Sequence, residues 1–237
     1  IQFGYDINSS KAETYNPKVN LGTWTRENNQ SRIQKNSGNF WSLNNYLTYN
    51  FNIKKHSVSA MLGQECWESN YDYVSVFNTN LPNDIVHNPA LGSGTAQIGS
   101  GWGSSSMASF FTRETYNYDD RYLATYTYRY DGSSNFGPSN RWAGFHSVAL
   151  AWRFSNEKFM KNLKWLSNGK LRLGWGQVGN QGIGGYKWGS AMSTMDTALG
   201  TSYRPANLKN TSIMWEKQEQ WNVGLDLGFL NNRLNVT

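Results

Sequence analysis

One glycine pattern in the sequence has the form of a phosphate-binding loop. Gly174, Gly176 and Gly179 follow the spacing GxGxxG. A dinucleotide site needs this pattern between a strand and a helix, where the helix N-terminus meets the pyrophosphate. Here the glycines lie inside an alternating segment, and no helical pattern follows them. They predict close backbone approach within a strand, not nucleotide binding.

Carboxylates and histidines give no pattern typical of catalysis or metal binding. Two acidic pairs, Glu65 with Glu68 and Asp119 with Asp120, invite comparison with glycosidase carboxylates. The first pair flanks a predicted strand end and the second forms a tight turn, so neither predicts a cleft. Isolated histidines and a single cysteine lack the spacing of a metal site. These residues are His56, His87, His146 and Cys66. We expect no enzymatic activity, no metal and no cofactor.

Aromatic side chains in two long predicted loops, 68–108 and 180–219, are the better candidates for binding. Such rings stack on the faces of sugars, and loops carry binding residues more often than strands do. The alternative is that they pack the loops together or contact a partner protein. The candidate substrate contacts are Tyr71, Tyr73, Phe77, Trp102, Tyr186, Trp188 and Tyr203; Trp215 lies in the second loop as well.

The composition limits the fold that positions these residues. The chain has 237 residues, of which 15% are aromatic and 38% hydrophobic, and its mean hydropathy is −0.67. Few aliphatic residues exclude a helical bundle, and many aromatic ones argue against disorder. No apolar run approaches the ~20 residues of a membrane-spanning helix. The basic residues behind the net charge of +6 are scattered, so no nucleic-acid partner is expected. An all-β protein remains, either soluble or a membrane barrel.

Alternation of apolar and polar residues predicts a series of strands. In 121–131, for example, Tyr126 and Tyr128 lie on one face while Thr127 and Arg129 lie on the other. The segments are about ten residues long, which is the length of a tilted strand that crosses a bilayer. The predicted strands are 41–52, 57–66, 110–118, 121–131, 142–154, 170–179 and 221–229.

The connections between these strands alternate in length. Long ones are 9–39, 68–108 and 180–219, and short ones are 53–56, 119–120 and 230–232. The connection 132–141 is of medium length, and 155–169 is expected to hold a short helix. Outer-membrane barrels have short periplasmic turns and long extracellular loops, so this order favours a barrel over a β-sandwich. It predicts that the first strand runs outward. A turn is expected at 131–134 and a short capped helix within 155–169.

Several collinear segments resemble the SusC/RagA family of TonB-linked outer-membrane transporters. They cover about residues 40–235, although 68–108 and 182–214 show no family pattern. The segments are LTYN at 47–50, LGQE at 62–65, DRYL at 120–123, DGSSNFGP at 131–138, NRW at 140–142, AWR at 151–153, EKFM at 157–160, LSN at 166–168, KLR at 170–172, GQVGNQ at 176–181, WE at 215–216, QWNVGLD at 220–226 and FLNNRL at 229–234.

The resemblance implies a transmembrane antiparallel β-barrel in the outer membrane, usually of 22 strands around an N-terminal plug. It also implies a SusD-like surface lipoprotein, TonB, and an oligosaccharide or peptide cargo. Residues 1–237 are expected to form roughly nine strands of the barrel, because both ends of the sequence fall in mid-strand; the plug and the other strands would lie elsewhere in the parent protein. Arg129, Arg153 and Arg172 are expected to face the lumen or plug. The alternatives are a soluble carbohydrate-binding β-sandwich and a passive porin.

Overall fold

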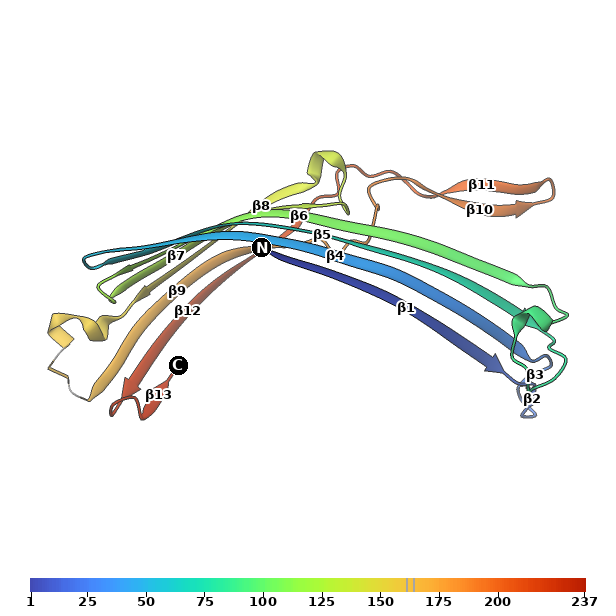
Figure 1. The fold of residues 1–237 in the computed structure, drawn as a ribbon, viewed down its shortest axis with the longest axis horizontal. Coiled ribbons are helices and arrows are strands. Elements are labelled where there is room, and N and C mark those ends of the chain that lie inside the picture. The colour runs from blue at the N-terminus through green and yellow to red at the C-terminus, as the bar shows by residue number, and fades with distance from the viewer. Residues whose placement is uncertain (161, 164) are drawn as a thin grey trace. The chain divides into compact units, whose positions relative to one another are not determined.

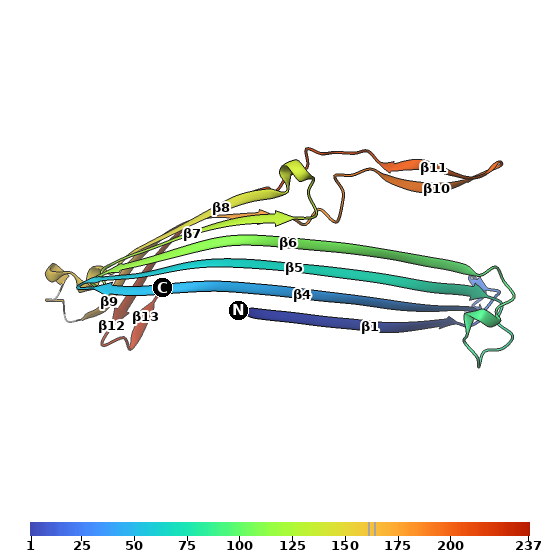
Figure 2. The same ribbon diagram turned by 45° about the horizontal axis from the view of Figure 1, so that its top comes forward.

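The computed structural model describes residues 1–160, 162–163 and 165–237. One nine-stranded antiparallel sheet dominates the fold, in the order β1-β4-β5-β6-β7-β8-β9-β12-β13 (Figures 1 and 2). Its strands are β1 (Gln2–Asn16), β4 (Gln30–Ile53), β5 (His56–Thr79), β6 (Gln97–Tyr118), β7 (Tyr122–Ser133), β8 (Trp142–Trp152), β9 (Leu166–Asn180), β12 (Glu216–Phe229) and β13 (Leu234–Val236). Each strand of the sheet pairs with its neighbour in the chain, apart from the small strands inserted between them.

Two small hairpins and four 3₁₀ turns complete the secondary structure of the described residues. The hairpins are β2 (Val19–Asn20) with β3 (Thr25–Arg26), and β10 (Ala191–Thr197) with β11 (Gly200–Asn207). The 3₁₀ turns are η1 (Pro89–Leu91), η2 (Pro138–Asn140), η3 (Phe154–Asn156) and η4 (Lys158–Met160). Among the described residues no second large sheet packs on the first, as a β-sandwich would require. No helix in this part of the chain is long and apolar enough to cross a membrane.

The chain divides into two compact units. The first unit comprises Ile1–Gln2, Leu43–Cys66 and Ser106–Thr237, and the second comprises Phe3–Ser42 and Trp67–Ser105. The long strands β4, β5 and β6 contribute residues to both.

The strands predicted from alternation are confirmed, but several are longer than predicted. Residues 9–16, 30–39, 68–79 and 97–108 belong to β1, β4, β5 and β6, so the predictions of long loops at 9–39 and 68–108 are wrong over most of their length. The true connections are 17–29 and 80–96. The strand extensions that were predicted to be loops are rich in Ser, Asn and Gly, a composition typical of loops. Pairing with a neighbouring strand nevertheless satisfies the backbone N–H and C=O groups of these extensions.

Two further predictions are corrected at the strand ends. The turn expected at 131–134 begins later, because Asp131–Ser133 still belong to β7 and the Asp131 carboxylate is bound by Arg129. The helix expected within 155–169 is represented, in the described residues, by the 3₁₀ turns η3 and η4. The tight turn at Asp119 and Asp120 is confirmed, and both residues have positive φ.

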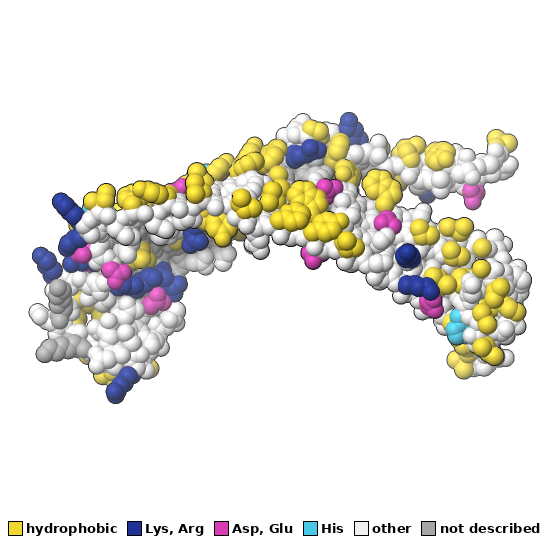
Figure 3. Space-filling view, viewed as in Figure 1, with side chains coloured by type: hydrophobic (Ala, Val, Ile, Leu, Met, Phe, Trp, Pro, Cys, Tyr) yellow, Lys and Arg dark blue, Asp and Glu magenta, His cyan; other side chains and the backbone are white. Residues whose placement is uncertain are grey.

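Cross-strand register in the first unit separates two faces. Tyr126, Val148 and Trp175 are aligned on one face of β7, β8 and β9. Their neighbours Thr127, Ser147 and Gly176 are aligned on the other. The large exposed rings and Leu side chains of the first face are expected to contact lipid, and the small polar side chains of the second face a watery lumen. Figure 3 shows several basic side chains at its left end, where the short turns lie, and others elsewhere on the same face.

A charge placed on the two faces of β8 tests this assignment. Leu150→Lys puts an ammonium on the exposed apolar face, whereas Ala149→Lys puts it on the small polar face one residue away. We expect Leu150→Lys to destabilise the folded protein in bilayers by about 1–2 kcal/mol, because Leu150 lies two residues from the end of β8 and the cost of a lipid-facing cation falls from the midplane toward the interface. Ala149→Lys is the matched control. Equal destabilisation by both substitutions, measured by denaturant unfolding in lipid vesicles, would contradict the assignment.

Candidate functional site

Arg129 is the centre of a charge cluster on the polar face of the first unit. Its Nε donates to Asp131 Oδ1 over 2.7 Å. Its Nη2 donates to Glu65 Oε2 over 2.9 Å and to Ser109 Oγ over 2.8 Å. The guanidinium carbon also lies 5.4 Å from the centre of the Phe111 ring. We call Glu65, Ser109, Arg129 and Asp131 the Arg129 cluster.

The Arg129 cluster ties β5, β6 and β7 together. Asp131 is only 6% exposed and Ser109 is buried, so the carboxylate depends on the arginine for compensation of its charge. The sequence predicts that Arg129 faces the lumen or the plug, and the structure shows it paired with Glu65 and Asp131 of its own sheet. The pairing of Arg129 with Asp131 could have been predicted from their spacing of two residues, which places both side chains on one face of a strand.

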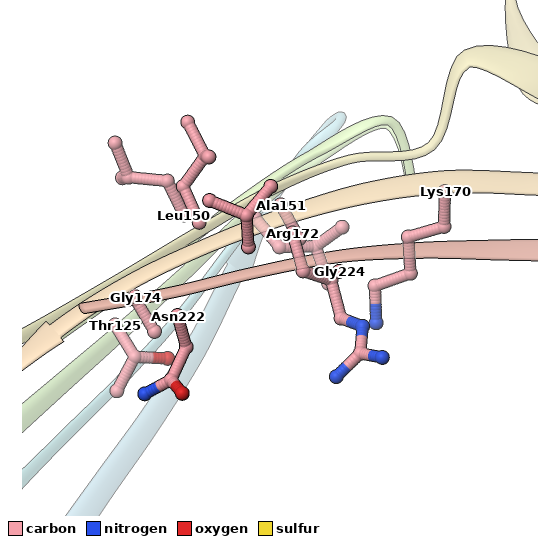
Figure 4. Close-up of a pocket in the computed structure, with 12 residues that line it drawn as sticks. Thr125, Leu150, Ala151, Lys170, Arg172, Gly174, Asn222 and Gly224 are labelled. Carbon is pink, nitrogen blue, oxygen red and sulfur yellow. The ribbon is translucent and has the colours of Figure 1, made fainter. Parts of the chain in front are cut away.

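Arg172 lies beside an open hollow on the same polar face. Its Nη2 donates to Asp226 Oδ1 over 2.7 Å, and its guanidinium crosses Gly224, where no side chain obstructs it. The hollow has a volume of about 500 Å³. Figure 4 shows Lys170 and Arg172 extending together on one side of the ribbon, with Leu150 on the other. Its lining combines small or polar residues with large apolar ones. The first are Thr125, Ala149, Ala151, Gly174, Asn222 and Gly224, and the second are Leu123, Leu150, Leu173 and Val223.

Arg153, which the sequence predicts to face the lumen or plug, lies directly after the end of β8. It forms an ion pair with Asp120 in the neighbouring turn. Asn156 adds a bond from Nδ2 to the Asp120 carbonyl over 2.9 Å. Arg153 therefore joins two of the short turns, because its position follows the last residue of the strand.

A second cluster at the short turns surrounds Glu157, and we call Arg121, Tyr122, Trp152 and Glu157 the turn cluster. Glu157 Oε1 accepts from Tyr122 Oη over 2.7 Å and from Trp152 Nε1 over 3.3 Å. Arg121 Nη1 lies 3.4 Å from Glu157 Oε2. The bond from Tyr122, followed by those from Trp152 and the charge of Arg121, lowers the pKa of the Glu157 carboxyl although its burial opposes this.

The candidate binding rings of the second unit are divided between two faces. A Cβ on Gly103 would collide with the Tyr71 ring, and one on Gly101 would lie 2.6 Å from the Tyr73 ring. Tyr71, Tyr73 and Phe77 alternate along β5 and therefore share this face. Trp102 lies between the two glycines on β6, so it points to the opposite face. The structure brings the first three rings together and separates Trp102 from them.

The candidate rings of 180–219 also separate. Tyr186 and Trp188 have ring centres 6.5 Å apart, and a Cβ on Gly137 would lie 3.6 Å from the Trp188 ring. Tyr203 is exposed on β11, on a hairpin apart from these two. Trp215 is buried at 7% exposure, so it serves packing and was a weak candidate for cargo stacking.

Trp215, Phe136 and Phe145 form a small apolar cluster, which we call the loop core. Phe136 is fully buried, and its ring centre lies 4.9 Å from that of Trp215. Trp215 Nε1 donates to the Arg141 carbonyl over 2.9 Å. The loop core thus fixes the 134–141 connection against the start of β12. It unites three segments that carry the resemblance to the SusC/RagA family, and sequence reasoning read the first of them only as a turn.

No group of three potential metal ligands occurs in the described ranges. The glycines Gly174, Gly176 and Gly179 lie within β9, which pairs with β12 along its length. The prediction that they belong to a strand is confirmed.

Long antiparallel strands with short turns at one end, long connections at the other and an apolar exposed face are typical of an outer-membrane β-barrel wall. The chain belongs to the family of TonB dependent receptor-like β-barrels, whose family model matches residues 1–237. Members of this family are outer-membrane receptors and transporters.

Among its curated relatives, the chain is 42% identical over 146 residues to the TonB-dependent receptor SusC of Bacteroides thetaiotaomicron, covering 55% of this chain and 14% of SusC. It is 27% identical over 248 residues to the TonB-dependent receptor P39 of Formosa agariphila, covering 99% of this chain and 23% of that protein. The chain thus spans less than a quarter of these relatives.

The solved structures of the RagAB peptide transporter share the fold. One superimposes with a TM-score of 0.89 at 27% identity, covering 98% of this chain and 26% of that one. A second, of the RagAB importer in the open-open state, gives a TM-score of 0.87. The SusC/RagA resemblance is confirmed.

The Arg129 cluster makes a prediction for stability. Arg129→Met leaves the Asp131 carboxylate buried without its cation, which costs about 3–5 kcal/mol in a fully buried pair. Because the Arg129 side chain is 35% exposed, we expect a loss of about 2–3 kcal/mol in the free energy of unfolding of detergent-solubilised protein. Arg113→Met, an exposed arginine on the same face of β6, is the control and should change it by less than about 0.5 kcal/mol. Equal losses would show that the cluster has no particular role.

The turn cluster makes a prediction for pH dependence. The folded-state pKa of Glu157 lies below its unfolded value of about 4.3. Its stabilisation is therefore present above that value and is lost as the pH falls through the folded-state pKa. We expect Glu157→Gln to have a lower Tm than the wild type at pH 7, and the difference to shrink at pH 3. Glu27→Gln, which alters an exposed carboxylate, should show no such pH dependence; a constant difference for Glu157→Gln would refute the prediction.

Proposed function

We propose that this chain is part of the barrel wall of a TonB-dependent importer of oligosaccharides or peptides. The match of the family's barrel model to all 237 residues is the observation that carries this proposal. A plug and the remaining strands, supplied by the rest of the protein, would close the barrel, because a sheet with unpaired edges is too costly in lipid. The protein would capture cargo and perform no chemistry on it.

Two cargo classes follow from the relatives. The RagAB structures with which the fold superimposes are those of a peptide transporter, and the stretch of highest identity is to SusC. Exposed or half-exposed rings suit both classes, since they stack on sugars and on peptide side chains. We assign cargo contacts to Tyr71, Tyr73 and Phe77 on one face of β5, and to Tyr186, Trp188 and Tyr203 in the 180–219 connection.

The partners are a SusD-like surface lipoprotein over the long connections and TonB at the plug. The hollow beside Arg172 supports a role for the plug. It presents two cations, Lys170 and Arg172, against one nearby carboxylate, Asp226. A plug segment with an acidic side chain would complement this charge. Arg129 is paired with two carboxylates within the sheet, whereas Lys170 and Arg172 lie beside one, so these two cations are the better candidates for such a contact.

TonB dependence tests the proposal. A strain that lacks the gene should lose uptake of the oligosaccharides or peptides that support growth of the wild type, and a tonB deletion should abolish the same uptake. Energy coupling through TonB is the reason, because the plug blocks passive flow. Radiolabelled uptake in the complemented strain is the measurement.

Uptake that persists without TonB would favour a passive porin. Recovery of the full-length protein in the soluble fraction, without the heat-modifiable gel mobility of an outer-membrane barrel, would contradict the membrane assignment itself. A SusC-like protein with a deleted plug is the matched control for passive leakage.

A further inference from the structure

One arginine of the second unit forms no ion pair with a carboxylate of the described residues. Arg32 of β4 is exposed. Its guanidinium carbon lies 5.7 Å from the centre of the Phe77 ring on β5, which is a cation–π contact. This contact orients the side chain and leaves its charge without a counter-ion. Arg129, in contrast, is paired with two carboxylates, and Arg172 with one.

The Arg32 side chain lies on the face of the sheet that carries the proposed cargo contacts of β5. Its contact with the Phe77 ring requires this, because side chains on opposite faces of a sheet do not meet. Tyr71 and Tyr73 alternate with Phe77 along β5 and therefore share the face. The guanidinium is thus available to the same ligand as the tyrosine rings.

Neutral polar groups surround Arg32 on this face. Asn36 Nδ2 donates to Ser10 Oγ of β1 over 3.1 Å, and Gln34 Nε2 donates to Asn36 Oδ1 over 2.8 Å. Strand alternation gives the neighbouring positions of the face, and none of them carries a charge. They are Ser10, Ala12 and Thr14 of β1, Gln30, Gln34 and Asn36 of β4, and Tyr73, Ser75 and Thr79 of β5.

The carboxylates of β5 that lie nearest in sequence are on the opposite face. Asp72 accepts from Ser37 Oγ, and Glu68 accepts from Trp41 Nε1. Both acidic residues alternate with Tyr71 and Tyr73, so the sheet separates them from Arg32. An anionic ligand on the cargo face therefore meets a cation at Arg32 and no acidic side chain among these strand neighbours.

We propose that Arg32 selects cargo that carries carboxylates, and that this cargo is an acidic oligosaccharide built of uronate residues. The inference rests on the import function proposed above and narrows its cargo class. A planar guanidinium binds a carboxylate through two parallel N–H donors. The amides of Gln34 and Asn36 both donate and accept, as sugar hydroxyls do. The rings of Tyr71 and Tyr73 supply surfaces on which pyranose faces stack.

An acidic peptide is the competing ligand. The strands β4 and β5 both lie inside the sheet, so their main-chain groups are already paired with neighbouring strands. This face consequently offers side chains and no free strand edge, and it lacks the main-chain pairing by which an extended peptide adds to a sheet. A ligand dense in hydroxyl groups fits the row of amides and hydroxyls better.

Binding to the detergent-solubilised full-length protein tests the proposal. The probes are tetragalacturonate and tetramannuronate, each compared by calorimetry with its neutral carboxyl-reduced form. The wild type should bind at least one acidic probe about tenfold more tightly than the neutral form. Arg32→Gln should weaken binding of that acidic probe about tenfold and remove the preference, because it deletes a charge-assisted pair. Arg32→Lys keeps the charge without the planar fork and should retain part of the preference.

Lys35→Gln is the matched control. It removes an exposed cation three residues away on the opposite face of β4 and should leave both affinities unchanged. Heat-modifiable gel mobility of every variant verifies folding. An equal loss in Arg32→Gln and Lys35→Gln would show that net charge alone matters and would overturn the proposal.

Three further results would also overturn it. The wild type could bind neither acidic probe, or bind the acidic and neutral forms equally. Arg32→Gln could bind as the wild type does. Hexaglutamate could bind in an Arg32-dependent manner while the uronates do not, which would assign the site to acidic peptides.

The uptake assay keeps this inference distinct from the proposed function. TonB-dependent uptake of a neutral cargo that is unchanged in Arg32→Gln would overturn the role of Arg32 and leave the import function intact. Uptake without TonB would refute the import mechanism, whereas the preference for carboxylates measured by calorimetry does not depend on TonB.

Discussion

Pairing of backbone N–H and C=O groups between neighbouring strands is the constraint on which the rest of this structure depends. In lipid no water can satisfy these groups, so each strand needs a partner on both sides. The described strands accordingly form one large antiparallel sheet in which neighbours pair, and β4, β5 and β6 continue this pairing well past the length needed to cross a bilayer. Within the sheet the paired backbone groups are used, so the side chains and connections are left to make other contacts.

Charged side chains add a second level of organisation. The Arg129 cluster joins β5, β6 and β7, and the turn cluster joins the turns on either side of β7 and β8. Each cluster holds a carboxylate of low exposure, Asp131 or Glu157, among several donors. The contact of Arg129 with Glu65 spans 64 positions in the chain, and the contact of Tyr122 with Glu157 spans 35. These contacts therefore stabilise the order of the strands and not only the conformation of a single turn. Arg129, which was predicted to face the lumen, is therefore engaged in ion pairs within the sheet.

Alternation was enough to predict the strands of the first unit, because the rings at Tyr126, Trp152 and Trp175 contrast with small polar neighbours. It failed at 68–79 and 97–108, where Ser, Asn and Gly weaken the contrast although pairing continues. The pairing of Arg129 with Glu65 spans 64 positions and depends on register, which a single sequence does not reveal. The loop core escaped prediction for the same reason, since Phe136 and Trp215 meet only after the intervening strands have paired. Nor did the sequence reveal that Trp102 and Tyr71 lie on opposite faces.

The tyrosine–glycine contacts between β5 and β6 have a consequence for how this protein can change over evolution. Because Tyr71 and Tyr73 lie over Gly103 and Gly101, a slip of one residue would drive Trp102 into the tyrosine rings. The register of β5 and β6 is therefore fixed, whereas the 80–96 connection between them can gain or lose residues without changing that register. The connections of such a protein can diversify in sequence and length while the register of the sheet stays the same.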